Sequence, residues 1–323
     1  MIVGQDRAIG QFLDAWSTRR LHHAWLIAGP RGVGKASFAR AAAKRVLADA
    51  AGPPSAPGLD VGDDHPTAHL LAAGSHPDFR LLERLENPKT GNLSRNISVD
   101  QVRGLGDMLG VTPSMSPWRA IVIDSADDLE ASAANALLKM LEEPPANTIF
   151  FLVAHAPGRL LPTIRSRCRR LDFEPLGDDA MTSLLSTLIP DENVPELVRL
   201  AGGSPGRALQ GASLDLAPLE AEARAMMAEG DVDNGRRSKL ASTLSGKAAA
   251  ERYAAFLDLV PALIAREARS ADEPRRSRAL DAYARTRETV ALAPRLSLDP
   301  AATMFELGGI LASVAGTPAS LKR

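Results

Sequence analysis

The sequence predicts an N-terminal α/β domain built on a parallel sheet, followed by helical regions. Strongly apolar runs at 24–28, 119–124 and 149–153 alternate with helical stretches, and such alternation produces parallel sheets with right-handed crossovers. Strand-like patterns stop after Phe173, and aromatic residues make up only 4% of the chain, which favours helices packed by aliphatic side chains. We therefore expect three parts: an α/β domain at 1–173, a small helical domain at 174–212 and a larger all-helical domain at 213–323.

Hydrophobic periodicity and turn residues give the order of elements in the first domain. The apolar runs are interpreted as strands, with a shorter strand near 79–82 and a last one after an arginine-rich segment at 163–170. Residues 51–75 are rich in Gly, Pro, Ala and Asp and lack periodicity, so we expect a surface excursion there. Helices are expected at 3–18, 35–50, 99–109 and 131–142, and from about Pro157.

The remainder of the chain is expected to be helical. A region at 214–323 contains apolar residues at helical spacing, which form one stripe typical of a core or a subunit interface. The stripe consists of Phe256, Leu259, Val260, Leu263 and Ile264. Shorter helices are expected at 178–187, 194–201 and 205–211.

Composition limits the classes of function. Lys and Arg total 38 in the 323 residues, against 39 Asp and Glu, so no net positive field attracts nucleic acid. The single cysteine, Cys168, excludes an internal disulfide and a cysteine-cluster zinc site, and it suits a reducing compartment. The apolar runs are shorter than the roughly 20 residues of a membrane span, and no signal-peptide pattern is present. We expect a cytoplasmic protein with no membrane partner.

A glycine-rich turn, GPRGVGKA at 29–36, lies between the first strand and the next helix. Gly29, Gly34 and Lys35 match the G-x-x-x-x-G-K of a phosphate-binding loop, with Gly32 between them. The N-terminus of the following helix would direct backbone N–H groups at the phosphates. The full motif then needs a Ser or Thr to hold Mg²⁺, but Ala36 stands there. The loop therefore either retains ATP or ADP binding or now only connects a strand to a helix.

The carboxylates that an ATPase needs are also incomplete. Asp124 ends a buried strand and is the expected metal-side carboxylate of a P-loop ATPase. The next position, where such an enzyme carries Glu, is Ser125, which is a poor general base. Asp127 and Asp128 lie further along the chain, on a loop expected to face away from a γ-phosphate. Loss of a positioned base lowers the rate roughly 10²- to 10⁴-fold, so we expect negligible hydrolysis by this chain.

The segment at 163–170 carries four arginines, and three interpretations stay open. It fits a solvated edge or a phosphate-binding patch, and it also fits a guanidinium offered to the γ-phosphate of a neighbouring subunit. Cys168 lies within it and is expected to behave as a small buried hydrophobe. The histidines lack metal-ligand spacing, so no metal site is expected. The four arginines are Arg165, Arg167, Arg169 and Arg170.

Several motifs together resemble those of the AAA+ clamp-loader subunits of bacterial DNA polymerase III. The most specific are the run NALLKMLEEPP at 135–145 and the Ser-Arg-Cys triplet at 166–168. The resemblance covers about 1–212, and the C-terminal third matches only as a helical region. It implies an AAA+ P-loop domain at 1–173, a helical lid at 174–212 and an oligomerisation collar at 213–323. Further matching motifs are HAW at 23–25, HPD at 76–78, ISVDQVR at 97–103 and GGSPGR at 202–207.

Within that family the chain is similar to the non-hydrolysing stator subunit rather than to the ATP-hydrolysing gamma/tau subunit. Ala36, Ser125 and Ala154 stand where an active member has polar catalytic or sensor residues. The resemblance makes Arg167 an arginine finger presented to ATP on an adjacent gamma/tau subunit. It also places Arg207 at the second sensor position of the degenerate nucleotide site.

The resemblance implies a hetero-oligomer with gamma/tau and delta subunits, which acts on the sliding clamp and primed DNA. No cofactor is required by this chain, and DNA polymerase activity belongs to the whole complex. Family members commonly carry a four-cysteine zinc module near 51–75, but this segment has no cysteine, so zinc is not expected.

Two rival functions stay open. An autonomous P-loop ATPase of the gamma/tau type would use Ser37 for the metal and Asp127 for the water. A nucleotide-independent scaffold would instead bind DNA directly through its arginines.

Overall fold

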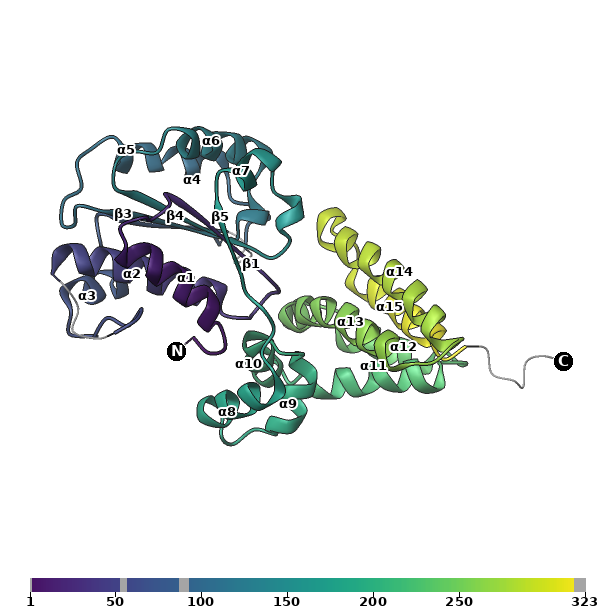
Figure 1. Ribbon diagram of the computed structural model, residues 1–323. Helices are drawn as coiled ribbons and strands as arrows, with labels where there is room; N and C mark the ends of the chain where they lie inside the picture. Colours follow the sequence, from purple (N-terminus) through teal and green to yellow (C-terminus); the bar gives the residue numbers. More distant parts are fainter. Residues whose placement is uncertain (1, 53–56, 87–92, 317–323) are drawn as a thin grey trace. The chain divides into compact units, whose positions relative to one another are not determined.

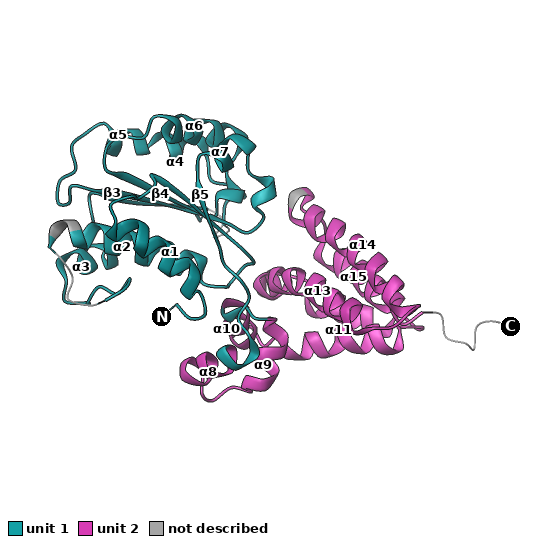
Figure 2. Ribbon diagram, viewed as in Figure 1, with its two compact units in different colours: residues 1–180, 203–205 teal, residues 181–202, 206–323 magenta. Residues whose placement is uncertain are grey.

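The structure, a computed structural model, describes residues 2–52, 57–86 and 93–316. The chain divides into two compact units (Figure 2), one formed by 1–180 with 203–205 and the other by 181–202 with 206–323. No helix within the described ranges is long and apolar enough to cross a membrane.

The first unit is built on a five-stranded sheet in the order β2-β3-β4-β1-β5 (Figure 1). Every neighbouring pair of strands is parallel, which confirms the predicted parallel sheet. Because crossover helices cover both faces, the inner strands read as continuous apolar runs. The strands are β1 (Ala24–Ala28), β2 (Phe79–Glu83), β3 (Arg119–Asp124), β4 (Thr148–Ala154) and β5 (Arg169–Asp172).

Helices pack on both faces of this sheet (Figure 1). On one face, Phe12 and Phe38 join Trp25 of β1 in a buried aromatic cluster. On the other face, Leu137, Leu141 and Ile164 pack against the sheet. The first face carries α1 (Asp6–Ser17), α2 (Lys35–Ala51) and α3 (Pro66–Ala72); the second carries α4 (Val99–Arg103), α5 (Leu105–Leu109), α6 (Ala131–Glu142) and α7 (Pro162–Ser166).

Three expectations about helices need correction. The expected excursion at 51–75 contains α3, because Pro66 suits the first helical turn and the His65 ring accepts a hydrogen bond from Thr67 N. Its residues 53–56 lie outside the described ranges. The single helix expected at 99–109 is divided at Gly104. The helix expected from Pro157 is a 3₁₀ turn, followed after two residues by α7.

The second unit consists of helices, and no strand follows β5 among the residues that the structure describes. The stripe predicted from Phe256 to Ile264 lies on α13 and is buried in the core of this unit. The helices are α8 (Asp178–Leu188), which begins in the first unit, then α9 (Val194–Ala201), α10 (Pro205–Ser213), α11 (Ala217–Glu229), α12 (Gly235–Thr243), α13 (Ala250–Ser270), α14 (Arg275–Leu296) and α15 (Pro300–Ser313).

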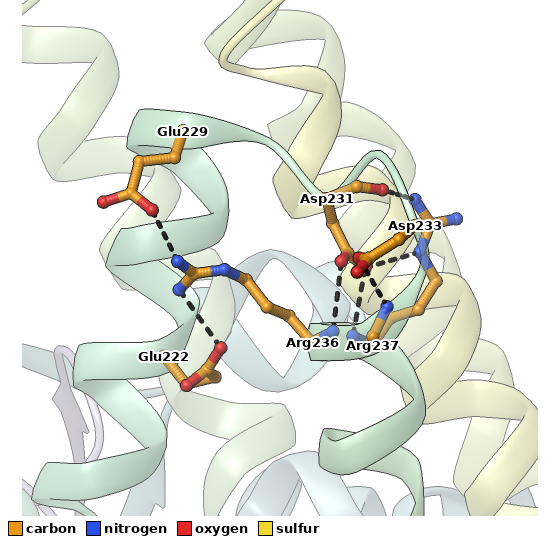
Figure 3. A network of polar contacts seen from close by, with 7 residues as sticks. Glu222, Glu229, Asp231, Asp233, Arg236 and Arg237 are labelled. Atoms are coloured by element: carbon orange, nitrogen blue, oxygen red, sulfur yellow. Dashed lines mark hydrogen bonds and ion pairs between the residues drawn. The ribbon is translucent and has the colours of Figure 1, made fainter.

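A buried carboxylate holds the turn between α11 and α12 (Figure 3). The Asp231 side chain accepts hydrogen bonds from the backbone N–H groups of Arg236 and Arg237, each at 3.0 Å, and from Arg237 Nε at 2.9 Å. Burial acts to raise the pKa of Asp231, but these hydrogen bonds outweigh it and hold the pKa below its ordinary value. Arg237 in turn lies over the Phe305 ring of α15 at 5.4 Å, so the carboxylate also orders a helix contact.

We predict that Asp231→Ala lowers the free energy of unfolding by about 2–4 kcal/mol at pH 7, because it leaves buried donors without an acceptor. A lowered folded-state pKa means that this stabilisation is present above the unfolded pKa of about 4 and is lost as pH falls through the folded pKa. Urea denaturation at several pH values measures the effect. The exposed Asp233→Ala is the control and should change stability far less; equal losses for both variants would contradict the prediction.

Candidate functional site

The glycine loop leaves the carboxyl end of β1, between β4 and β5. Gly29 N donates to Ala154 O at 3.2 Å, and Phe173 N donates to Ala28 O at 2.8 Å. A Cβ on Gly29 would lie 2.2 Å from the Phe173 carbonyl oxygen, so only glycine fits there. Gly32 and Gly34 have φ values of 75° and 95°, which also favour glycine. The predicted loop geometry is therefore present.

Lys35 begins α2 and is buried, with 3% of its surface exposed. Its ammonium donates to the Gly29 carbonyl oxygen at 2.7 Å and to the Pro30 carbonyl oxygen. A P-loop lysine normally reaches the β- and γ-phosphates. Here the ammonium is directed at the carbonyl oxygens of its own loop, and a nucleotide would have to replace these contacts.

Asp124, the carboxylate expected on the metal side, lies at the end of β3, which β4 separates from β1. Burial raises the pKa of Asp124, whereas the Arg40 guanidinium of α2, 3.7 Å away, favours the charged form. The same guanidinium lies 3.3 Å from Glu83, which pairs with Asp124 in the register of β2 and β3. Ala36 offers no metal ligand, and Ser37 is exposed on α2.

The polar residues after Asp124 form contacts within the protein. Ser125 is buried, and its hydroxyl donates to Asp127 at 2.9 Å. The Asp127 carboxylate also accepts from the N–H groups of His155 and Ala156, the latter at 3.2 Å. Asp127 therefore joins the loops that follow β3 and β4. Asp128 forms an ion pair with Arg84 at 3.3 Å.

The end of β4 supplies no polar side chain, because its last residue is Ala154, whose methyl group is fully buried. The next residue, His155, was assigned no chemistry from the sequence. Burial lowers its pKa to about 4, with a further contribution from the charges of Lys35 and Arg31. Its ring is therefore neutral at pH 7 and lies in the electrostatic field of the glycine loop. Its position directly after a buried strand is the signal that could have found it.

The motif at 202–207 is divided between the units. Ser204 belongs to the first unit, is buried, and donates to the Arg31 carbonyl of the glycine loop at 2.9 Å. Arg207 belongs to the second unit and is half-buried on α10. Its part in a nucleotide site stays a prediction.

The arginine segment separates into different environments. Arg169 lies over the Trp25 ring at 5.0 Å, and Arg170 pairs with Asp172 at 2.6 Å. Arg167 follows α7 directly; its Nη1 donates to the Thr163 carbonyl at 3.0 Å, and its Nη2 lies 2.8 Å from a Glu142 oxygen. About a third of the Arg167 side chain, 35%, is exposed. The guanidinium is therefore held by two contacts on a partly exposed side chain.

Cys168, beside Arg167, behaves as the sequence predicted. It packs against the core of α6 and α7, and burial raises the pKa of its thiol to about 12. A thiol with this pKa stays protonated at neutral pH, so it is no nucleophile. Among the described residues, no group of three or more His, Cys, Asp and Glu side chains could hold a metal ion.

Comparison with known proteins gives relatives of two kinds. The delta-prime subunit of DNA polymerase III from Pseudomonas aeruginosa is 39% identical over 57% of this chain and 53% of its own length. The gamma/tau subunit from Mycobacterium tuberculosis is 34% identical over 63% of this chain and 34% of its own length. The matched part thus spans about half or less of these curated relatives.

The solved structure of a gamma subunit-related protein from Thermotoga maritima is 16% identical to this chain in sequence. The match covers 94% of this chain and 99% of that protein, with a TM-score of 0.46. The model of the family described as DNA polymerase III, delta subunit, matches residues 4–177. That match covers more than half of the chain, from the first helix past the end of the sheet. The chain therefore belongs to the DNA polymerase III delta subunit family, and its resemblance to delta-prime is confirmed.

Proposed function

We propose that this chain is a non-hydrolysing, delta-prime-like stator of the DNA polymerase III clamp loader. In this role it presents Arg167 to ATP on a neighbouring gamma/tau subunit and helps to load the sliding clamp on primed DNA. The observation that carries the proposal is an asymmetry in one unit. The chain lacks the groups that hydrolyse ATP, yet it displays an ordered, accessible guanidinium.

The loss of hydrolysis rests on three positions. Ala36 cannot hold Mg²⁺, Ser125 cannot act as an efficient base, and Ala154 offers no polar group. Asp127, the substitute that an autonomous ATPase would need, is engaged by Ser125 and two backbone N–H groups. A carboxylate held in this way is poorly placed to activate water.

The role in trans rests on the chemistry of Arg167. An arginine finger stabilises the charge that develops on a transferred γ-phosphoryl group, and its planar fork suits phosphate oxygens. Two of its five N–H donors are engaged within the described residues, so three donors are left for another molecule.

The remaining assignments extend the likeness to clamp-loader subunits beyond the matched residues 4–177. We propose that 174–212 acts as a lid and 213–323 as a collar that joins gamma/tau and delta subunits in the cytoplasm. Residual ATP or ADP binding at the glycine loop, with Arg207, is compatible with this role. Contact with the clamp and DNA is made through the complex, since the chain carries nearly balanced charge.

The second candidate is an autonomous ATPase of the gamma/tau type, which the gamma/tau relatives favour. It requires turnover by the chain alone. The stator role requires none.

We predict that Arg167→Ala reduces ATP turnover by the complex reconstituted with gamma/tau and delta subunits. Loss of an arginine finger lowers the rate at the affected site about 10³-fold or more, so total turnover should fall by at least that site's share. Phosphate release under steady state measures this. Arg170→Ala, which removes an exposed arginine paired with Asp172, is the matched control. Unchanged turnover with Arg167→Ala would refute the finger role.

We also predict that the purified chain alone releases no phosphate from ATP above the rate of a buffer blank. The reason is the combined absence of a base and a metal ligand. Turnover that disappears in Asp124→Ala would establish the autonomous ATPase instead.

A further inference from the structure

Glu142 contacts the proposed finger from a different helix. It is the last residue of α6, and its Oε1 lies 2.8 Å from Arg167 Nη2. Arg167 lies directly after α7, and α6 and α7 pack side by side on one face of the sheet (Figure 1). The ion pair thus connects two elements whose positions are fixed by the fold.

The backbone under Glu142 is firmly held. Leu141, the preceding residue, is 1% exposed in the core, and its carbonyl lies 3.1 Å from His23 Nε2. Ile164 holds α7 in the same core and is fully buried. The carboxylate therefore extends from a rigid base toward a guanidinium whose own helix is equally anchored.

The contacts leave part of the guanidinium available. Nη1 donates one N–H to Thr163 O and Nη2 donates one to Glu142. Each terminal nitrogen has a second N–H, and Nε has one, so a phosphate could bind without breaking either contact. Without such contacts, a long arginine side chain samples many rotamers. The entropy that it would lose on contact with a phosphate then opposes binding.

We propose that Glu142 is a positioning residue for Arg167, which holds the guanidinium ready for a phosphate on the neighbouring subunit. This inference rests on the proposed function, because it requires Arg167 to act in trans. Glu142 itself touches neither ATP nor the reacting atoms; it acts only by restricting where Arg167 lies.

The test measures ATP turnover by the reconstituted complex that contains each variant of this chain. The part of the turnover that Arg167→Ala removes is the Arg167-dependent turnover. We expect Glu142→Ala to lower the Arg167-dependent turnover on the order of 3- to 10-fold, because the Arg167 side chain would lose its pre-organised position. The change in kcat should exceed the change in the KM for ATP, because an arginine finger acts mainly on the charge that develops during phosphoryl transfer. Glu142→Gln retains an acceptor oxygen and should recover part of the rate.

Two controls separate positioning from a structural role. Glu143→Ala removes the same charge one residue later, from an exposed side chain that has no ion pair among the described residues, and should leave turnover unchanged. Each variant should keep its melting temperature within about 3 °C, because half-exposed ion pairs contribute little to stability. In the Arg167→Ala background, Glu142→Ala should have no further effect.

The outcomes are distinguishable. If Arg167→Ala does not change turnover, the proposed function fails. If Arg167→Ala lowers turnover but Glu142→Ala leaves turnover unchanged or raises it, the positioning role fails and the finger role stands. A further loss in the double variant relative to Arg167→Ala would also overturn the positioning role, because Glu142 would then act independently of Arg167.

Discussion

The close approach at the carboxyl end of β1 is the constraint on which the first unit depends. The Gly29 backbone N–H donates a hydrogen bond to Ala154 at the end of β4, and Gly29 lies so near the Phe173 carbonyl that no side chain fits there. Because β1 lies between β4 and β5, this one crossing brings together the glycine loop, the loop after β4 and the segment that continues from β5. The glycines therefore have a structural purpose of their own, so their presence alone does not indicate hydrolysis.

The glycine loop and the Arg167 segment lie in the same unit, and their surroundings differ. At the first, Lys35 contacts its own loop, Asp124 faces Arg40, and Asp127 joins two loops. At the second, the fold fixes the bases of Arg167 and Glu142 independently, with Leu141 and Ile164 in the core. The proposed loss of hydrolysis needs only small changes, since Ala36, Ser125 and Ala154 are accommodated without disturbing the sheet. Under the proposed function, a subunit of this kind does not hydrolyse ATP and still assists a neighbour.

The sequence predicted the sheet and most helices because buried parallel strands leave long apolar runs that few other structures produce. It missed α3, where Pro66 and His65 begin a helix inside a segment whose composition indicates a loop. The glycine loop, Asp124 and Arg167 could be placed from motifs. The ion pair of Glu142 and the burial of His155 could not be predicted from the sequence, because both depend on side chains brought together from distant segments. The contacts of Arg169 with the Trp25 ring and of Arg170 with Asp172 needed three-dimensional geometry to distinguish these arginines from Arg167.

Under the proposed function, a guanidinium of this chain serves ATP bound to another subunit. An experimental structure of the assembled complex with a non-hydrolysable ATP analogue tests this role most directly. The finger role predicts that Arg167 lies within hydrogen-bond distance, about 3 Å, of the γ-phosphate on the adjacent subunit. An Arg167 that lies away from every subunit interface in that complex would contradict it.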